Sequence, residues 1–288
     1  MDKDIKRLSL ILLMAPFALW ILLLIIIPHV GIFLLSLREK ISYKEFTYGL
    51  GNYIEFLNEP IYWNTLLRTG SMSLLVTILA LLIGFPVAYY IAKVARKKSK
   101  GALFLLCLLP LWVSELIRTF GWILLLRETG VVSGFLQTIG IIDQPVEFLY
   151  NDVTVIMGLV YTVMLFMIVP LVSTLDGMDD AMVEAGYNLG GSGFTVLRRI
   201  IIPYAMPGIV AGSIVVFMLA AGSYLTPILL GGKNSSWFTE QIYDQFITRY
   251  NWESGAAFGF LLLAFTSIVV WLGLRLTGQS LATTVAKD

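Results

Sequence analysis

The sequence predicts an all-α integral membrane protein, folded as a bundle of six transmembrane helices. Of its 288 residues, 58% are hydrophobic and only 14% are charged, and the mean hydropathy is +0.83. A soluble domain typically has about 25% charged and about 45–50% apolar residues. The apolar residues also come in continuous blocks rather than alternating with polar ones, which indicates that lipid is the solvent.

Six of these blocks are long enough to cross a bilayer, which takes about 20 mostly apolar residues. Transmembrane strands would instead alternate in segments of about 10 residues. In the first block, Pro28-His29 is expected to bend the helix or to end its lipid-facing part. In the fifth, Pro207 and Pro227 are expected to kink or break the helix. The predicted spans are Leu8–Leu37, Leu66–Ala92, Gly101–Leu126, Val153–Leu175, Tyr204–Leu230 and Gly255–Thr277.

The charged residues and the single Cys and His narrow the possible functions. A net charge of +1 gives no global field that favours nucleic acid. Cys107 is the only cysteine and His29 the only histidine. An intrachain disulfide and a thiolate zinc site are therefore excluded, and we expect no metal site and no Cys/His nucleophile. We expect a single transmembrane domain over residues 1–288, without a soluble domain or strong internal repeat.

Lysine and arginine orient the predicted bundle with both termini in the cytoplasm. With that orientation the inner segments hold 12 of these residues and the outer segments 7, and Arg118 lies inside a span. The cluster Lys93–Lys100 contributes most to this bias, and we interpret it as a topology determinant rather than a lipid-binding patch. The outer count includes Lys44 and Lys233, and the inner count includes Lys287.

The loop between the fourth and fifth blocks, residues 176–203, is predicted to form a helix, a glycine turn and a second helix. Asp179 or Asp180 can cap the first helix. The glycines at 190, 191 and 193 end that helix, and Ser192 can cap the second, which runs to Pro203. Small apolar residues recur about once per turn of the first helix: Ala181, Ala185 and Leu189, with Met182 beside them. Such a ridge suits insertion into another protein's groove, but an ordinary loop on lipid would have the same pattern.

This loop resembles the EAA loop of permease subunits in type I ABC importers. That pattern is E-A-A, three residues, G, nine residues and I-x-L-P, and the chain has Glu184-Ala185-Gly186, Gly190 and Ile200-Ile201-Ile202-Pro203 at the same spacing. Gly186 replaces the second alanine, and Ile202 replaces leucine. The resemblance implies the type I importer permease fold, with a coupling helix in which Glu184 contacts a cytoplasmic ATPase subunit and Gly190 makes the turn. The residues assigned to this coupling site are Asp180, Ala181, Glu184, Ala185, Gly186, Leu189, Gly190 and Pro203.

Other segments resemble the permeases of spermidine/putrescine importers. These are Pro110–Arg118, Gly158–Tyr161, Phe166–Pro170 and Pro207–Gly212, and permeases for ferric iron, opines or amino-acid-like solutes share parts of them. The resemblance implies an inner-membrane protein, surrounded by lipid, with three partners: an ATPase dimer, a second permease and an extracytoplasmic solute-binding protein. The chain has no P-loop GxxxxGK[ST], so ATP and Mg²⁺ would be bound by the ATPase, and we expect no cofactor here.

Two charged residues inside the third block are candidates for the solute path. Counted from Gly101, Glu115 lies about 21 Å across the membrane, and Arg118 follows at i+3. The two can pair with each other and fix the orientation of the helix, or Glu115 can line a polar path for a cationic polyamine. Aromatic faces also attract ammonium groups, so Trp112, Tyr161 and Tyr224 complete the predicted path, although packing is an alternative role for each.

Two other functional classes agree less well with the sequence. A secondary transporter working alone usually has internal repeats. A membrane enzyme needs a convergent catalytic set, and the chain contains neither HExxH nor Gly-x-Ser-x-Gly. The sequence therefore favours a transport subunit without catalysis of its own.

Overall fold

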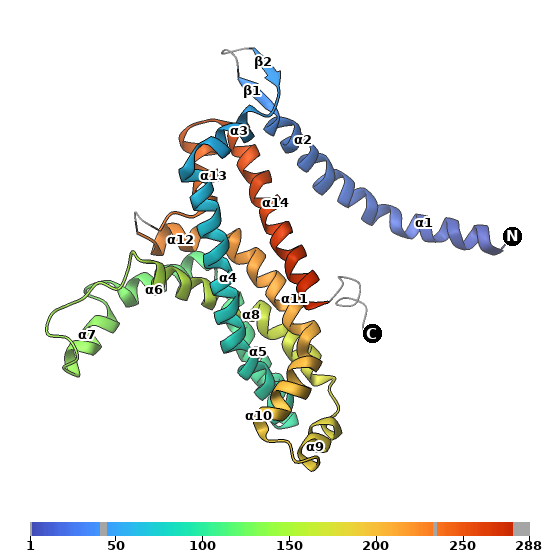
Figure 1. The fold of residues 1–288 in the computed structure, drawn as a ribbon, viewed down its shortest axis with the longest axis vertical. Coiled ribbons are helices and arrows are strands. Elements are labelled where there is room, and N and C mark those ends of the chain that lie inside the picture. The colour runs from blue at the N-terminus through green and yellow to red at the C-terminus, as the bar shows by residue number, and fades with distance from the viewer. Residues whose placement is uncertain (1, 41–44, 233–234, 279–288) are drawn as a thin grey trace. The chain divides into compact units, whose positions relative to one another are not determined.

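The computed structural model describes residues 2–40, 45–232 and 235–278, which form two compact units (Figure 1). The first unit comprises Met1–Asn64 and Gln241–Ala264, and the second comprises Thr65–Glu240 and Phe265–Asp288. Lys44, Lys233 and Lys287, which enter the charge count, lie outside the described residues.

The described residues contain five continuous helices that are long and apolar enough to cross a membrane. A bent pair of helices, Lys97–Trp112 and Glu115–Thr138, supplies a sixth candidate if the pair is one span. The predicted all-α membrane bundle is therefore confirmed. The five continuous helices are Leu12–Ser36, Pro60–Val94, Asp152–Asp176, Gly193–Ala221 and Trp252–Thr277.

The first span is one helix that continues past Pro28. Helix α1 (Asp2–Ile21) leads through a π-helical turn, Leu22–Ile26, into α2 (Ile27–Ser36). Pro28 lacks the amide hydrogen that would bond to the carbonyl four residues earlier, and the π turn lies where that hydrogen bond is missing. The helix therefore runs through Pro28-His29, where a bend or the end of its lipid-facing part was predicted.

Between the first and second predicted spans, the first unit contains two short strands and a helix. Strands β1 (Arg38–Lys40) and β2 (Phe46–Tyr48) pair antiparallel, with Arg38 opposite Tyr48. Helix α3 (Gly51–Asn58) follows. Its Phe56 packs against Phe258 at a ring-centroid distance of 5.6 Å, and Tyr62 packs against Phe258 at 4.7 Å. These edge-to-face contacts form the aromatic core of the unit.

Helices α4 (Pro60–Tyr89), α8 (Asp152–Asp176) and α11 (Ile202–Ala221) build the core of the second unit, in which α8 and α11 pack most closely. Gly208 and Gly212 of α11 make this approach possible. A Cβ atom at Gly208 would lie 2.8 Å from the Pro170 carbonyl oxygen, and one at Gly212 would lie 3.2 Å from the Met167 Cα. Gly208 and Gly212, spaced four residues apart, therefore serve packing within the chain.

Three of the helices from Pro60 onward lie partly in the first unit. The elements of this part of the chain connect through short breaks. They are α4 (Pro60–Tyr89), a π turn (Tyr90–Val94), α5 (Lys97–Leu108), a 3₁₀ turn (Leu109–Trp112), α6 (Glu115–Leu126), α7 (Val131–Thr138), α8 (Asp152–Asp176), α9 (Asp180–Asn188), α10 (Gly193–Val196), a π turn (Leu197–Ile201), α11 (Ile202–Ala221), α12 (Leu225–Leu230), α13 (Phe238–Tyr243) with its π turn (Asp244–Thr248), and α14 (Trp252–Thr277).

Two predicted spans are broken rather than continuous. The third bends by 89° between Trp112 and Glu115, because Pro110 favours a 3₁₀ turn and Val113 and Ser114 are extended. The distance of Glu115 across the membrane, counted along one straight helix, is therefore wrong. The fifth ends at Ala221 and a separate helix begins at Leu225. Pro207 lies inside α11 without breaking it.

We predict that Gly208→Ala destabilises the protein by about 1–3 kcal/mol, because the added methyl group meets a backbone carbonyl that cannot move aside. Thermal unfolding in detergent would measure the loss. Gly273→Ala is the matched control, since a Cβ atom there has no neighbour within 4 Å. Equal melting temperatures for the two variants would contradict the assigned α8–α11 contact.

Candidate functional site

The segment between α8 and α11 folds as the predicted helix, turn and helix. Asp179 caps α9 by accepting a hydrogen bond from the Ala181 amide at 3.0 Å. Ser192 caps α10 by accepting from the Thr195 amide at 3.3 Å. Figure 1 shows α9 and α10 together at one end of the second unit. The predicted end of the second helix at Pro203 is wrong, because α10 continues through a π turn into α11 and reaches Ala221.

Gly190 makes the turn that separates the two helices. Its φ is +80°, a left-handed conformation that costs about 1–2 kcal/mol for a residue with a Cβ atom. The Gly190 amide donates to the Tyr187 carbonyl, and the Gly191 amide donates to the Gly186 carbonyl. This pair of hydrogen bonds is the Schellman arrangement, which satisfies the last carbonyls of a helix.

One side of α9 lies open. None of its residues is buried, and Ala181, Glu184 and Ala185 are exposed, followed by Leu189 with 89% of its surface exposed. Gly186 faces the other way, since a Cβ atom there would lie 2.5 Å from the Ile200 Cδ1 atom. The substitution of glycine for the second alanine of the EAA pattern thus makes room for Ile200.

Basic residues hold the first turn of α9. Lys93 donates hydrogen bonds to the Met178 carbonyl oxygen and, at 2.8 Å, to Asp180. Lys100 forms an ion pair with Asp176, and the Tyr204 hydroxyl donates to the Gly177 carbonyl. The hydrogen bond from Lys93 holds the pKa of Asp180 below its usual value. The pair is therefore intact at neutral pH and is lost only as the pH falls through that lowered pKa.

A second group of predicted residues meets at a cavity of about 470 Å³ in the second unit. Glu115 opens α6 next to the break at Val113-Ser114, and Tyr224 lies in the break before α12. The two breaks bring Glu115 to Thr226, whose hydroxyl donates to the Glu115 carboxylate at 2.9 Å. Glu115, Arg118, Phe166, Ser223 and Tyr224 all line the cavity.

The ion pair between Glu115 and Arg118, one of the two alternatives that the sequence left open, is not formed, and the Glu115 carboxylate instead accepts a hydrogen bond from Thr226. Within the described part of the chain, the buried Nε and Nη1 atoms of Arg118 have no hydrogen-bond partner. The Arg118 Cζ atom lies 5.9 Å from the centroid of the Tyr161 ring. Tyr161 therefore contacts Arg118 rather than lining the cavity, and Trp112, with 80% exposure, is outside it as well.

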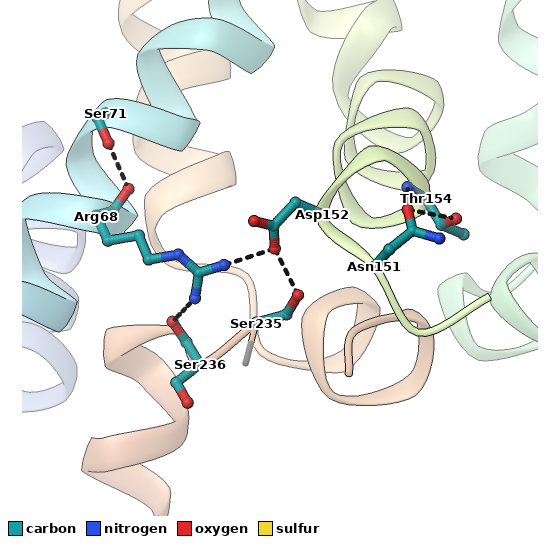
Figure 2. A network of polar contacts seen from close by, with 7 residues as sticks. All are labelled: Arg68, Ser71, Asn151, Asp152, Thr154, Ser235 and Ser236. Carbon is teal, nitrogen blue, oxygen red and sulfur yellow. Dashed lines mark hydrogen bonds and ion pairs between the residues drawn. The ribbon is translucent and has the colours of Figure 1, made fainter. Parts of the chain in front are cut away.

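A polar network at the first residue of α8 escaped sequence reasoning. The Asp152 carboxylate accepts from Arg68 of α4 at 2.5 Å and from the Ser235 hydroxyl. Arg68 also donates to the Ser236 carbonyl at 3.1 Å. Figure 2 shows Arg68 pointing between Asp152 and Ser236. The only sequence signal was an acidic residue in the first turn of a predicted helix, which is common and does not identify a partner.

Comparison with known proteins identifies the family. Residues 102–277 match the family described as "Binding-protein-dependent transport system inner membrane component". The Spermidine/putrescine transport system permease protein PotB of Escherichia coli (strain K12) is 34% identical over 90% of this chain and 96% of its own. The chain belongs to this family of permeases. PotB of Haemophilus influenzae is 32% identical, over 89% of this chain and 90% of its own.

Solved structures of ABC importers share the permease fold. A chain of the bacterial ABC transporter that imports the acidic polysaccharide alginate superposes with a TM-score of 0.73 at 21% identity, covering 96% of this chain and 97% of that one. A chain of the MetNI methionine ABC transporter gives 0.55 at 15% identity, over 76% and 97%. The chain is thus a multi-pass inner-membrane permease subunit, and the prediction of a transport subunit rather than an enzyme is confirmed.

In this permease we predict that Gly190→Ala destabilises the turn that ends α9, because the left-handed conformation of residue 190 is unfavourable for alanine. A loss of about 1–2 kcal/mol corresponds to roughly 5–30-fold faster local opening. Deuterium exchange of the α9 amides would measure it. Gly193→Ala, in the first residue of α10 with the nearest atom 3.8 Å away, is the control and should exchange like the wild type. Unchanged exchange in Gly190→Ala would contradict the assignment of the turn.

Proposed function

We propose that this chain is one of two permease subunits of an ATP-driven importer for polyamines such as spermidine and putrescine. The identity of 34% with a spermidine/putrescine permease, over nearly the whole of both chains, carries this proposal. Relatives named for other solutes are more distant, such as the putative ferric transport permease FbpB 1 of Haemophilus influenzae at 23% identity over 40% of its length.

In this proposal α9 is the coupling helix, and it lies on the cytoplasmic side with both termini. Its exposed residues, Ala181, Glu184, Ala185 and Leu189, would fill a groove on a cytoplasmic ATPase subunit, which holds ATP and Mg²⁺. Closure of the ATPase dimer would move α9 and switch the two permeases between inward-open and outward-open states. An extracytoplasmic solute-binding protein would deliver the polyamine on the opposite side.

The cavity at the two helix breaks is the proposed solute path. Glu115 is its carboxylate and can accept a hydrogen bond from an ammonium group, while Phe166 and Tyr224 offer aromatic faces. Arg118 lines the same cavity, and its Cζ atom lies 5.9 Å from the centroid of the Tyr161 ring, so an aromatic face accompanies this positive charge beside the proposed path. Broken helices within a membrane are tolerated where they line such a cavity.

We predict that Glu184→Ala uncouples the importer, so that ATP hydrolysis persists but polyamine uptake falls about tenfold or more. A tenfold effect corresponds to the loss of roughly 1.4 kcal/mol from one interfacial contact. Uptake of radiolabelled spermidine and ATP hydrolysis would be measured together in proteoliposomes containing all subunits. Glu128→Gln, exposed between α6 and α7, is the control. Wild-type uptake in Glu184→Ala would refute the coupling role.

We predict that Glu115→Gln reduces polyamine uptake about tenfold or more without impairing assembly. Glutamine keeps an oxygen that accepts from Thr226 but loses the charge that attracts an ammonium group, and hydrogen bonds to charged groups contribute about 1.5–3 kcal/mol. Uptake kinetics against spermidine concentration would measure the effect, with Glu147→Gln on an exposed loop as the control. Unchanged kinetics would make Glu115 a structural residue.

A further inference from the structure

Polar contacts link α4 and α8 near both ends of the two helices. Between these contacts the helices pack against each other. At one end, Arg68 of α4 binds Asp152, the first residue of α8 (Figure 2). Arg68 and Asp152 together also hold the segment before α13, since Ser235 donates to Asp152 and the Ser236 carbonyl accepts from Arg68. A displacement of this helix pair would therefore move the Ser235-Ser236 segment with it.

The middle of the pair is close-packed. A Cβ atom at Gly84 of α4 would lie 3.2 Å from the Met167 side chain and 3.5 Å from that of Ile168, both in α8. Ala80 and Ala88, one turn to either side of Gly84, are completely buried. At Gly84 a small residue thus lets α4 lie against Met167 and Ile168 of α8, and Ala80 and Ala88 belong to the same buried core. Because close-packed interiors are not continuously deformable, the two helices move together more readily than they slide.

The other end is held by Lys93, which follows α4 in the π turn Tyr90–Val94. Its ammonium group reaches the Met178 carbonyl oxygen and Asp180, so it binds the chain just after α8 and in the first turn of α9. Only 10% of the Lys93 side chain is exposed, whereas Lys97 and Lys98 are exposed and form no ion pair with any residue that the structure describes. Within the Lys93–Lys100 cluster, Lys93 is therefore the residue that binds α9.

We propose that Lys93 is a positioning residue that fastens the coupling helix α9 to α4. Helices α4 and α8 then move together with α9 as one body. Through Arg68 and Asp152, this motion displaces the Ser235-Ser236 segment. The inference rests on the proposed function, in which α9 is driven by the ATPase. It adds a route by which that motion reaches the far end of the helices, where the solute-binding protein would dock. Coupling free energies are reciprocal, so docking of that protein would act on α9 by the same route.

The test uses the whole transporter in proteoliposomes, with spermidine-loaded solute-binding protein added outside. The measured quantity is the ratio of ATP hydrolysis with the binding protein to hydrolysis without it, together with spermidine taken up per ATP hydrolysed. For Lys93→Met we expect the stimulation ratio to fall at least about fivefold, the lower end of typical coupling between sites. The double variant Lys97→Met/Lys98→Met removes two charges of the same cluster and should keep the wild-type ratio.

A wild-type ratio and wild-type uptake per ATP in Lys93→Met would overturn the proposal, as would an equal loss in the Lys97/Lys98 control. If Lys93→Met fails to assemble, Arg68→Met tests the same route, because Arg68 links α4 and α8 at their other end. Loss of stimulation with unchanged affinity for the binding protein supports the route, while a wild-type ratio, or loss of that affinity, overturns it. If Glu184→Ala uncouples and Lys93→Met does not, only this inference fails. If the wild-type complex shows no stimulation, the proposed function fails.

Discussion

The close contact between α8 and α11 is the constraint on which the functional parts of this permease depend. Gly208 and Gly212 lie against the backbone of Pro170 and Met167, so neither helix can shift without opening a gap in a dense core. The two helices are joined through α9 and α10, and their packing fixes both ends of that connection. Within it, the left-handed Gly190 sets the direction of α9 and leaves the side with Glu184 and Leu189 exposed.

Interrupted helices provide the second functional feature. A backbone in hydrocarbon must satisfy its own hydrogen bonds, so a break within a span is costly unless other groups or a polar cavity compensate. Here the break before Glu115 and the break before Leu225 occur at the same cavity. The hydrogen bond from Thr226 to Glu115 joins the helices that follow these breaks, α12 and α6. The same breaks bring together a carboxylate, hydroxyl groups and aromatic rings at one cavity.

Much of the fold was predictable from the sequence, because long apolar blocks and helix caps are local signals. The caps at Asp179 and Ser192 and the glycine turn followed from residue type and spacing alone. The break at Val113-Ser114 did not, since an apolar run containing Pro110 reads as one helix until tertiary packing selects the bend. For the same reason the sequence left the partner of Glu115 open: i,i+3 spacing permits an ion pair with Arg118, but Thr226 comes from a helix 111 residues away in sequence. The contacts of Arg68 and Lys93 join residues that are 84 and 87 positions apart in sequence, and no local pattern identifies such partners.

Cysteine cross-linking between α9 and the ATPase subunit tests the central claim most directly. Cys107 is the only native cysteine, so a Cys107→Ser background permits single cysteines at Ala185 on α9 and, as a control, at Val131 on α7. The account predicts that the cysteine at 185, but not the one at 131, cross-links to the ATPase, and that membrane-impermeant maleimide labels it only from the cytoplasmic side. Labelling of position 185 from the periplasmic side, or an ATPase cross-link at 131 and none at 185, would contradict it.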